Sequence, residues 1–249
     1  MKRLAQAIAP LLILIIGLAI CFQGFSWQLR VKEDYGSLKA NSLTVKDTMK
    51  EEDIPEGWRE YSIDGIAFWA LPGLKYDEKE SEQRSGTCYT DGSTYVTVFT
   101  GENISEKRSV DECLNDTGLT AADLRWFCTR TLKPYPLDEF EFLELCAELS
   151  PTDLDIHSYK QSRIVYSLLE FCPQLYDPLD NFRVDIIKDK NTRMYAMTFF
   201  EEAKEPYILV TVYTGKNNKA SVCISTGITG TDMEIATSLH SAEGATEEK

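Results

Sequence analysis

The sequence predicts an α+β protein. An antiparallel sheet, made of two N-terminal hairpins and a C-terminal four-strand meander, carries a central helical segment on one face, behind an N-terminal transmembrane helix. Three observations lead to this prediction. Residues 4–22 are almost entirely apolar, residues 120–171 repeat their apolar positions with helical spacing, and the segments on either side of 120–171 alternate like strands. The order strands, helices, strands is typical of an antiparallel sheet with helices packed on one face.

The apolar run of residues 4–22 is interrupted only by Gln6, and Lys2 and Arg3 precede it. Its 19 residues match the roughly 17 to 25 that a spanning helix needs and exceed the roughly 7 to 15 of a cleaved signal. The two cations favour a cytoplasmic N-terminus and an external domain. We therefore expect a single-pass protein of the cell membrane.

Two alternatives to a retained anchor stay open. Cleavage after Cys21 would release a secreted protein, with Ala19 and Cys21 at the small-residue positions of the cleavage site. Lipid attachment at Cys21 would make a lipoprotein, because residues 18–21 look like a bacterial lipoprotein box in which Ile20 departs from the expected small residue.

Changes in composition divide the chain into four parts. Residues 1–30 hold the cytoplasmic tip and the transmembrane signal anchor, residues 31–55 are polar like a stalk, and residues 231–249 form a polar tail. Between the stalk and the tail, residues 56–230 are dense in aromatic and β-branched side chains. The sequence therefore predicts one extracytoplasmic α+β domain over residues 56–230.

Two Asp-Gly pairs, at 64–65 and 91–92, each separate two short runs of aromatic and β-branched residues. Asp-Gly is suited to positive φ and is a strong signal of a tight turn between strands. We therefore expect β-hairpins over residues 61–69 and 87–99.

The middle of the chain changes to helical spacing. Thr120 and Asp123 have the spacing of a capping box, with Asp in place of Glu, and predict a helix that begins near residue 121. Residues 136–149 repeat apolar side chains at helical steps and predict a second helix. A third helix is expected over residues 158–171, where the apolar residues also fit a strand.

Alternation of apolar and polar residues returns after the helices. It covers four segments that short polar loops separate, namely residues 182–187, 194–200, 207–214 and 220–225. Strands joined by short loops pair with their neighbours in sequence, so we predict an antiparallel meander.

The chain is acidic, with 26 Lys and Arg residues against 40 Asp and Glu and a formal net charge of −14. Binding to nucleic acid depends on clustered cations that release counterions, so no nucleic-acid partner is expected. The acidity is consistent with a solvated surface, a basic partner or Ca²⁺, and we favour the solvated surface.

Six of the seven cysteines lie outside the anchor segment, where the compartment permits disulfides. The sequence does not choose among the many possible pairings. A domain of this length can bury its own core, and Cys146, Cys172 and Cys223 have apolar neighbours. We therefore favour buried thiols over disulfides.

Sequence motifs for catalysis or metal binding are missing. The chain has two histidines, His157 and His240, and lacks H-E-x-x-H, G-x-S-x-G and the phosphate-binding loop. Neither a metal ion nor another cofactor is expected. The enzymatic alternative is a membrane-tethered hydrolase that uses carboxylates or a thiol, Cys146 or Cys172, near His157. Both cysteines lie on apolar faces, where burial makes a thiol inert, so we favour a structural role.

Aromatic residues gather around the first hairpin, at Trp58, Tyr61, Phe68 and Trp69. Alternation along a strand places Phe68 and Trp69 on opposite faces, so one ring belongs to the core and the other faces a ligand or solvent. We expect Trp69, with Tyr61 and Trp58, to bind a protein, peptide or glycan. The preferred function is a membrane-anchored binding domain without catalytic activity.

One short pattern resembles a known family. The residues Asp64, Gly65, Ile66 and Phe68 followed by Pro72, with helices and then a meander, resemble PsbP-like domains. The resemblance covers a few residues and implies no activity.

Overall fold

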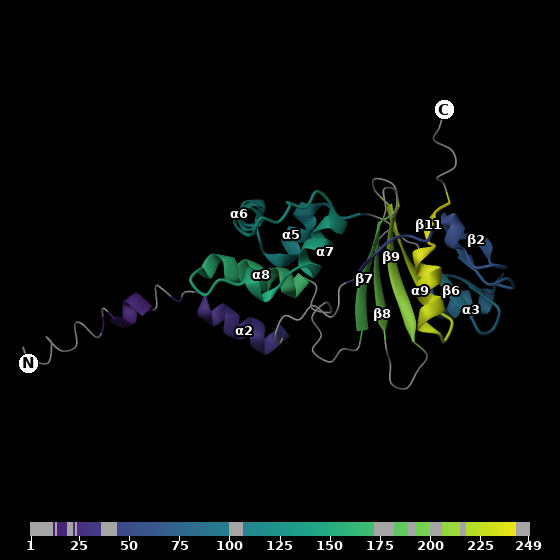
Figure 1. The fold of residues 1–249 in the computed structure, drawn as a ribbon, viewed down its shortest axis with the longest axis horizontal. Coiled ribbons are helices and arrows are strands. Elements are labelled where there is room, and N and C mark those ends of the chain that lie inside the picture. The colour runs from purple at the N-terminus through teal and green to yellow at the C-terminus, as the bar shows by residue number, and fades with distance from the viewer. Residues whose placement is uncertain are drawn as a thin grey trace, which may run out of the picture. The chain divides into compact units, whose positions relative to one another are not determined.

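The computed structural model describes residues 12, 14–18, 22, 24–35, 44–99, 107–171, 182–188, 193–199, 206–214 and 218–242. The chain forms two compact units (Figure 1). Unit 1 comprises Met1–Ala40, Val110–Leu137 and Glu141–Pro178, and unit 2 comprises Asn41–Ser109, Asp138–Phe140 and Leu179–Lys249. The mixed class predicted from the sequence is confirmed, with helices in unit 1 and mostly antiparallel strands in unit 2.

Unit 2 contains an eight-stranded sheet in the order β1-β7-β8-β9-β10-β6-β5-β4. The strands are β1 (Thr44–Lys46), β4 (Lys75–Tyr76), β5 (Thr87–Thr90), β6 (Tyr95–Phe99), β7 (Phe182–Lys188), β8 (Arg193–Phe199), β9 (Tyr207–Thr214) and β10 (Asn218–Ser225). The predicted meander is confirmed as β7 to β10, and the second predicted hairpin, β5–β6, extends it by pairing with β10. Among the described strands β1 and β7 form the parallel pair of this sheet.

The first predicted hairpin is also confirmed, but it does not join the main sheet. It consists of β2 (Arg59–Ile63) and β3 (Ile66–Ala70), joined by a turn in which Asp64 has φ 49° and Gly65 has φ 82°. The outer edge of β3 pairs with β11 (His240–Ser241) to make a separate three-stranded sheet.

The core of unit 2 lies between the main sheet and a layer formed by the small sheet and α9 (Thr229–Thr237). Figure 1 shows α9 in yellow beside the strands of the main sheet. The predicted polar tail over 231–249 is therefore corrected, because residues 231–242 belong to the fold. Met233, Ile235 and Leu239 are buried, but the Thr, Glu and Ser between them give this short helix a polar average composition.

Unit 1 is helical. Its elements are α2 (Phe25–Tyr35), α5 (Val110–Thr117), α6 (Ala121–Thr131), the part of α7 (Glu139–Ala147) that follows Phe140, the short 3-10 helix η2 (Pro151–Asp153) and α8 (Tyr159–Phe171). The three predicted helices are confirmed, and Thr120 and Asp123 form the predicted capping box.

Most of the predicted central helices pack within unit 1. Helix α8 packs against α2, α5 and α6 within unit 1, and its four residues Ile164, Val165, Leu168 and Leu169 are fully buried. These helices supply a core for one another, while Phe140, at the start of α7 in unit 2, packs edge to face on Tyr213 of β9 with ring centroids 5.3 Å apart.

The predicted stalk over 31–55 is corrected as well. Residues 31–35 belong to α2, residues 44–46 form β1 in the main sheet, and Glu51–Asp53 form the 3-10 helix η1. Val31 is buried. Mixed charge in this segment therefore marks short elements that lie mostly at the surface.

The predicted anchor lies mostly outside the described residues. Residues 14–18 are helical, and no helix within the described part of the chain is both long enough and apolar enough to cross a membrane.

The described cysteines are largely buried. Cys88, Cys128 and Cys223 are free thiols, as predicted, and Cys113 and Cys146 are buried. Burial raises the pKa of Cys128 and of Cys223 to about 11. Such thiols stay protonated and unreactive near neutral pH. Cys172 lies outside the described residues.

One buried acid gives unit 2 a pH-dependent stability. Asp232 is completely buried; its Oδ1 accepts a hydrogen bond of 2.6 Å from the Thr226 N–H, and its Oδ2 has no hydrogen-bond partner. Burial raises the pKa of Asp232 above its ordinary value of 3.8. The native state therefore holds this proton at pH values where the unfolded chain has lost it.

We predict that the unfolding free energy of the wild type, measured relative to Asp232→Asn, falls as pH rises above the unfolded pKa. The loss is complete above the native pKa and amounts to about 1.4 kcal/mol for each unit by which the two pKa values differ. Denaturant titrations of both proteins across about pH 3 to 8 measure this difference in unfolding free energy. The range is chosen because it brackets the ordinary pKa of a carboxyl group. A difference that is independent of pH would contradict the assignment.

Candidate functional site

The β2–β3 hairpin places two neighbouring aromatic residues on opposite faces, as predicted. Phe68 is fully buried in the core, whereas Trp69 is half-buried on the other face. In the register of the hairpin, Tyr61 lies opposite Phe68 and Glu60 lies opposite Trp69. The hairpin therefore directs an indole and a carboxylate away from the core on the same face.

Trp69 lines a pocket of about 220 Å³ in unit 2. Three segments that are far apart in the sequence form it: the segment around η1, the β2–β3 hairpin, and the end of α9 with β11. The lining residues are Thr48, Met49, Glu51, Ile54, Glu60, Trp69, Thr237, Ser238, Leu239 and His240.

Ser238 fixes the wall of the Trp69 pocket. Its Oγ accepts a hydrogen bond of 2.9 Å from the Trp69 N–H and donates one of 2.7 Å to the Ile235 carbonyl. The Met49 N–H donates to the Thr237 carbonyl at 2.9 Å and closes the opposite side. Because these bonds join backbone to backbone or to a buried hydroxyl, the walls of the pocket are held firmly.

His240 and Glu60 form a polar pair at the rim. The Nε2 of His240 is 3.1 Å from Glu60 Oε1, and its Nδ1 is 2.9 Å from the Ser238 carbonyl oxygen. The pair therefore holds the Glu60 carboxylate beside the indole of Trp69.

The Trp69 pocket combines an aromatic face with two carboxylates. No ring or cation packs on the Trp69 indole and no ion-pair partner reaches Glu51 within the described part of the chain. An aromatic face flanked by carboxylates attracts a cationic group, through the quadrupole of the ring and through opposite charge. The lining contains no cysteine, and the Ser238 hydroxyl donates to Ile235.

Tyr61 and Trp58, the other two predicted binding residues, do not line this pocket. Tyr61 stacks on Phe68 with ring centroids 5.7 Å apart, and its hydroxyl donates to the Leu71 carbonyl and accepts from the Gly73 N–H. Trp58 packs against the core. Both rings support the hairpin on the face opposite Trp69.

Sequence reasoning missed His240 and Glu60. His240 lay in the expected polar tail. Glu60 is one of 40 acidic residues, and the sign that could have found it is the register of the predicted hairpin, which puts it opposite Trp69. The spacing of Met233, Ala236 and Leu239 is helical and was the available sign that the fold continues to His240.

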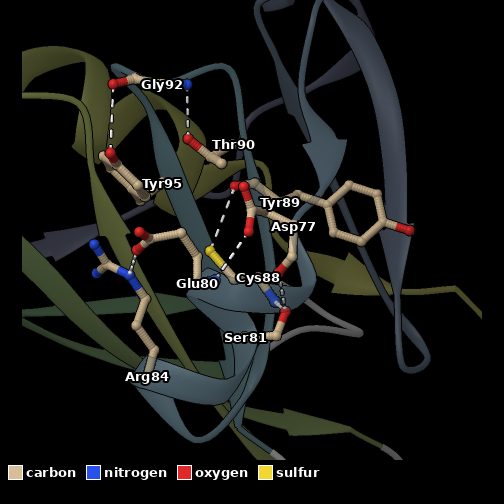
Figure 2. A network of polar contacts seen from close by, with 9 residues as sticks. All are labelled: Asp77, Glu80, Ser81, Arg84, Cys88, Tyr89, Thr90, Gly92 and Tyr95. Atoms are coloured by element: carbon tan, nitrogen blue, oxygen red, sulfur yellow. Dashed lines mark hydrogen bonds and ion pairs between the residues drawn. The ribbon is translucent and has the colours of Figure 1, made fainter.

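A second pocket, of about 440 Å³, is lined by Gly73, Lys75, Tyr76, Asp77, Glu80, Thr90, Asp91, Gly92 and Tyr95. Its carboxylates already have structural partners, as Figure 2 shows around α3 (Glu78–Arg84). Asp77 caps α3 by accepting from the Glu80 N–H at 2.9 Å, and Glu80 accepts from Arg84 at 3.0 Å. We therefore assign the Trp69 pocket as the stronger candidate site.

The residues of the enzymatic alternative lie elsewhere. His157 is in unit 1, where its ring centroid is 5.4 Å from that of Phe22, and Cys146 is fully buried. Neither the Trp69 pocket nor the second pocket contains His157 or a cysteine. Among the described residues, no group of three or more His, Cys, Asp and Glu side chains is arranged to hold a metal ion.

Comparison with models of known protein families and with curated proteins finds no match to this chain.

Proposed function

We propose that this protein is a membrane-anchored, extracytoplasmic binding module that holds a cationic side chain of a protein or peptide partner in the Trp69 pocket. The observation that carries the proposal is that Trp69 lines the pocket together with Glu60, its neighbour across the hairpin, and Glu51. A lysine or arginine side chain presents an apolar stem to an indole and a charged head to carboxylates.

The membrane part of the proposal is supported by the apolar segment. Within residues 4–22 the described side chains of Leu12, Leu14, Ile15, Ile16 and Leu18 are 50–58% exposed. Water-exposed leucine and isoleucine in such a run are unfavourable, whereas a lipid environment accommodates them. The preceding Lys2 and Arg3 favour an external domain.

The binding part can be tested with defined tripeptides. Saturation-transfer NMR on the full chain in lipid nanodiscs would compare acetyl-Gly-Lys-Gly-amide and its Arg analogue with the neutral Gln analogue. We expect saturation of the Lys and Arg methylene protons and none for Gln. Saturation by chitotriose in place of the cationic peptides would favour a glycan ligand and contradict the proposal.

Trp69→Ala should weaken binding of the cationic tripeptide by about 1 to 3 kcal/mol, because it removes the aromatic face. Trp69 is half-buried and outside the core, so the change should lower the unfolding free energy by less than about 1 kcal/mol. Glu60→Gln should also weaken binding, and Glu56→Gln, an exposed carboxylate outside the pocket lining, is the matched control. If Trp69→Ala bound the cationic tripeptide as tightly as the wild type, the Trp69 pocket would not be the binding site.

A further inference from the structure

Gly24, just after the apolar segment, is bonded to the loop that precedes α8. The Phe22 N–H donates to the Leu18 carbonyl at 2.9 Å, which continues the helical bonding, and the Gly24 N–H donates to the Ile156 carbonyl at 2.9 Å. Helix α2 then begins at Phe25 and packs on α8 (Figure 1). If residues 4–22 cross a bilayer, the loop that holds Ile156 lies at its surface.

Exposed apolar and aromatic side chains lie around this point in unit 1. Tyr159 and Trp126 are 47% and 36% exposed, and Leu132, at the end of α6, is 93% exposed. Leu132 also has φ 58°, a conformation that leucine rarely adopts, so the turn displays this side chain at a local conformational cost. Tyr159, the first residue of α8, contacts Trp27 of α2 with ring centroids 5.9 Å apart, and Leu132 directly follows α6, which carries Trp126.

Two cationic side chains, Arg130 and Lys160, lie among these exposed apolar and aromatic residues. Arg130 lies 3.9 Å from Asp155, whose backbone carbonyl is close to Gly24, and Lys160 packs over the Trp126 ring at 5.0 Å. We call Trp126, Arg130, Leu132, Tyr159 and Lys160 the collar.

The collar presents positive charge in a strongly acidic protein. The side chains of Arg130 and Lys160 are 61% and 45% exposed, whereas those of their acidic partners, Asp155 and Asp123, are 24% and 17% exposed. The same holds for Arg163, which is 40% exposed and also pairs with Asp123. The outward charge is therefore cationic, while the chain as a whole carries −14.

We propose that the collar rests on the surface of the bilayer that residues 4–22 enter and binds the phosphate-bearing headgroups of anionic phospholipids. This inference rests on the anchor in the proposed function. Trp and Tyr favour the headgroup region, Arg and Lys bind phosphate, and an exposed leucine gains by entering the apolar boundary. The collar then fixes unit 1 against the membrane, so that the chain carries no flexible spacer between bilayer and domain.

The test uses the full chain in nanodiscs, with the photoreactive residue p-benzoylphenylalanine replacing Leu132. We expect its main photoproduct to be a lipid adduct, identified by mass spectrometry. Replacing about a third of the neutral phosphatidylcholine by phosphatidylglycerol should raise the yield about fivefold, because cations near the surface favour anionic lipid. Arg130→Glu should remove that gain. Lys32→Glu is the matched control, because it makes the same charge change on the exposed side of α2 about 12 Å along the helix from Gly24.

A second probe at Ile15 separates this inference from the anchor. Lipid adducts at Ile15 with none at Leu132 would overturn the collar and leave the anchor standing. A protein adduct at Leu132 would show that a second copy or another protein covers the collar and would also overturn the inference. Failure of both positions to react with lipid would overturn the anchor together with the collar.

Discussion

Replacing Phe68 by alanine should lower the unfolding free energy of unit 2 by about 3 to 5 kcal/mol. Phe68 is fully buried in the layer between the small sheet and the main sheet, and Tyr61 stacks on its ring. Removing the ring eliminates a large buried apolar area and leaves a cavity that the hairpin on one side and the main sheet on the other restrain from closing. A urea titration, monitored by hydrogen exchange of the β2, β3 and β11 amides, measures the change in unfolding free energy.

The matched control for Phe68→Ala is Leu71→Ala in the same hairpin. Leu71 is 49% exposed, so its truncation should change the unfolding free energy by no more than about 0.5 kcal/mol. If Phe68→Ala lowered the unfolding free energy no more than Leu71→Ala does, the Phe68 side of the hairpin would not pack on the main sheet. A small effect of both would place Phe68 outside the core.

Replacing Gly24 by alanine should detach α2 from α8 and destabilise unit 1 by about 3 kcal/mol, at the upper end of the range for overpacking. A Cβ at Gly24 would lie 2.2 Å from the Asp155 carbonyl oxygen and 2.9 Å from the Ser158 carbonyl oxygen. Both are backbone atoms, so relief requires the loop or α2 to shift, which lengthens the Gly24–Ile156 hydrogen bond. Faster hydrogen exchange in α2 and in residues 155–162 would report the separation.

Gly17→Ala is the matched control for Gly24→Ala. It lies in the helical residues 14–18, and a Cβ there would meet no atom within 4 Å. We expect exchange in α2 to be unchanged by Gly17→Ala. If Gly24→Ala left hydrogen exchange in α2 at the wild-type rate, Gly24 would not lie in close contact with the loop. The apolar segment would then not be held against the domain at this point.

The elements that sequence analysis placed correctly depend on local interactions. The turn at Asp64 and Gly65 requires positive φ at both residues, which Gly adopts freely and Asp tolerates better than most residues. The capping box of Thr120 and Asp123 spans a single helical turn. Alternation in β8, β9 and β10 reflects strands with one face in the core, where Ala196, Val210 and Val222 are buried. Each of these signals is complete within a few residues, so the sequence alone predicts it.

The partners of these elements were predicted less well. Both hairpins were recognised, but β2–β3 pairs with β11 and β5–β6 pairs with β10, and the local pattern of each hairpin is the same. The central helices bury apolar faces against α2 and against one another, and an apolar face does not specify which surface it covers. Which elements meet is decided by long-range packing.

The same distinction applies to the candidate site. The sequence by itself determined that Phe68 and Trp69 lie on opposite faces of the hairpin, because side chains alternate along any strand. Only the tertiary structure decided that Glu51 and His240 line the same pocket, because residues around 51 and 240 meet the hairpin through β-pairing of β11 with β3 and through the Met49 to Thr237 hydrogen bond. Such contacts join positions almost 200 residues apart, and their free energy depends on the whole packed unit, which no local pattern encodes.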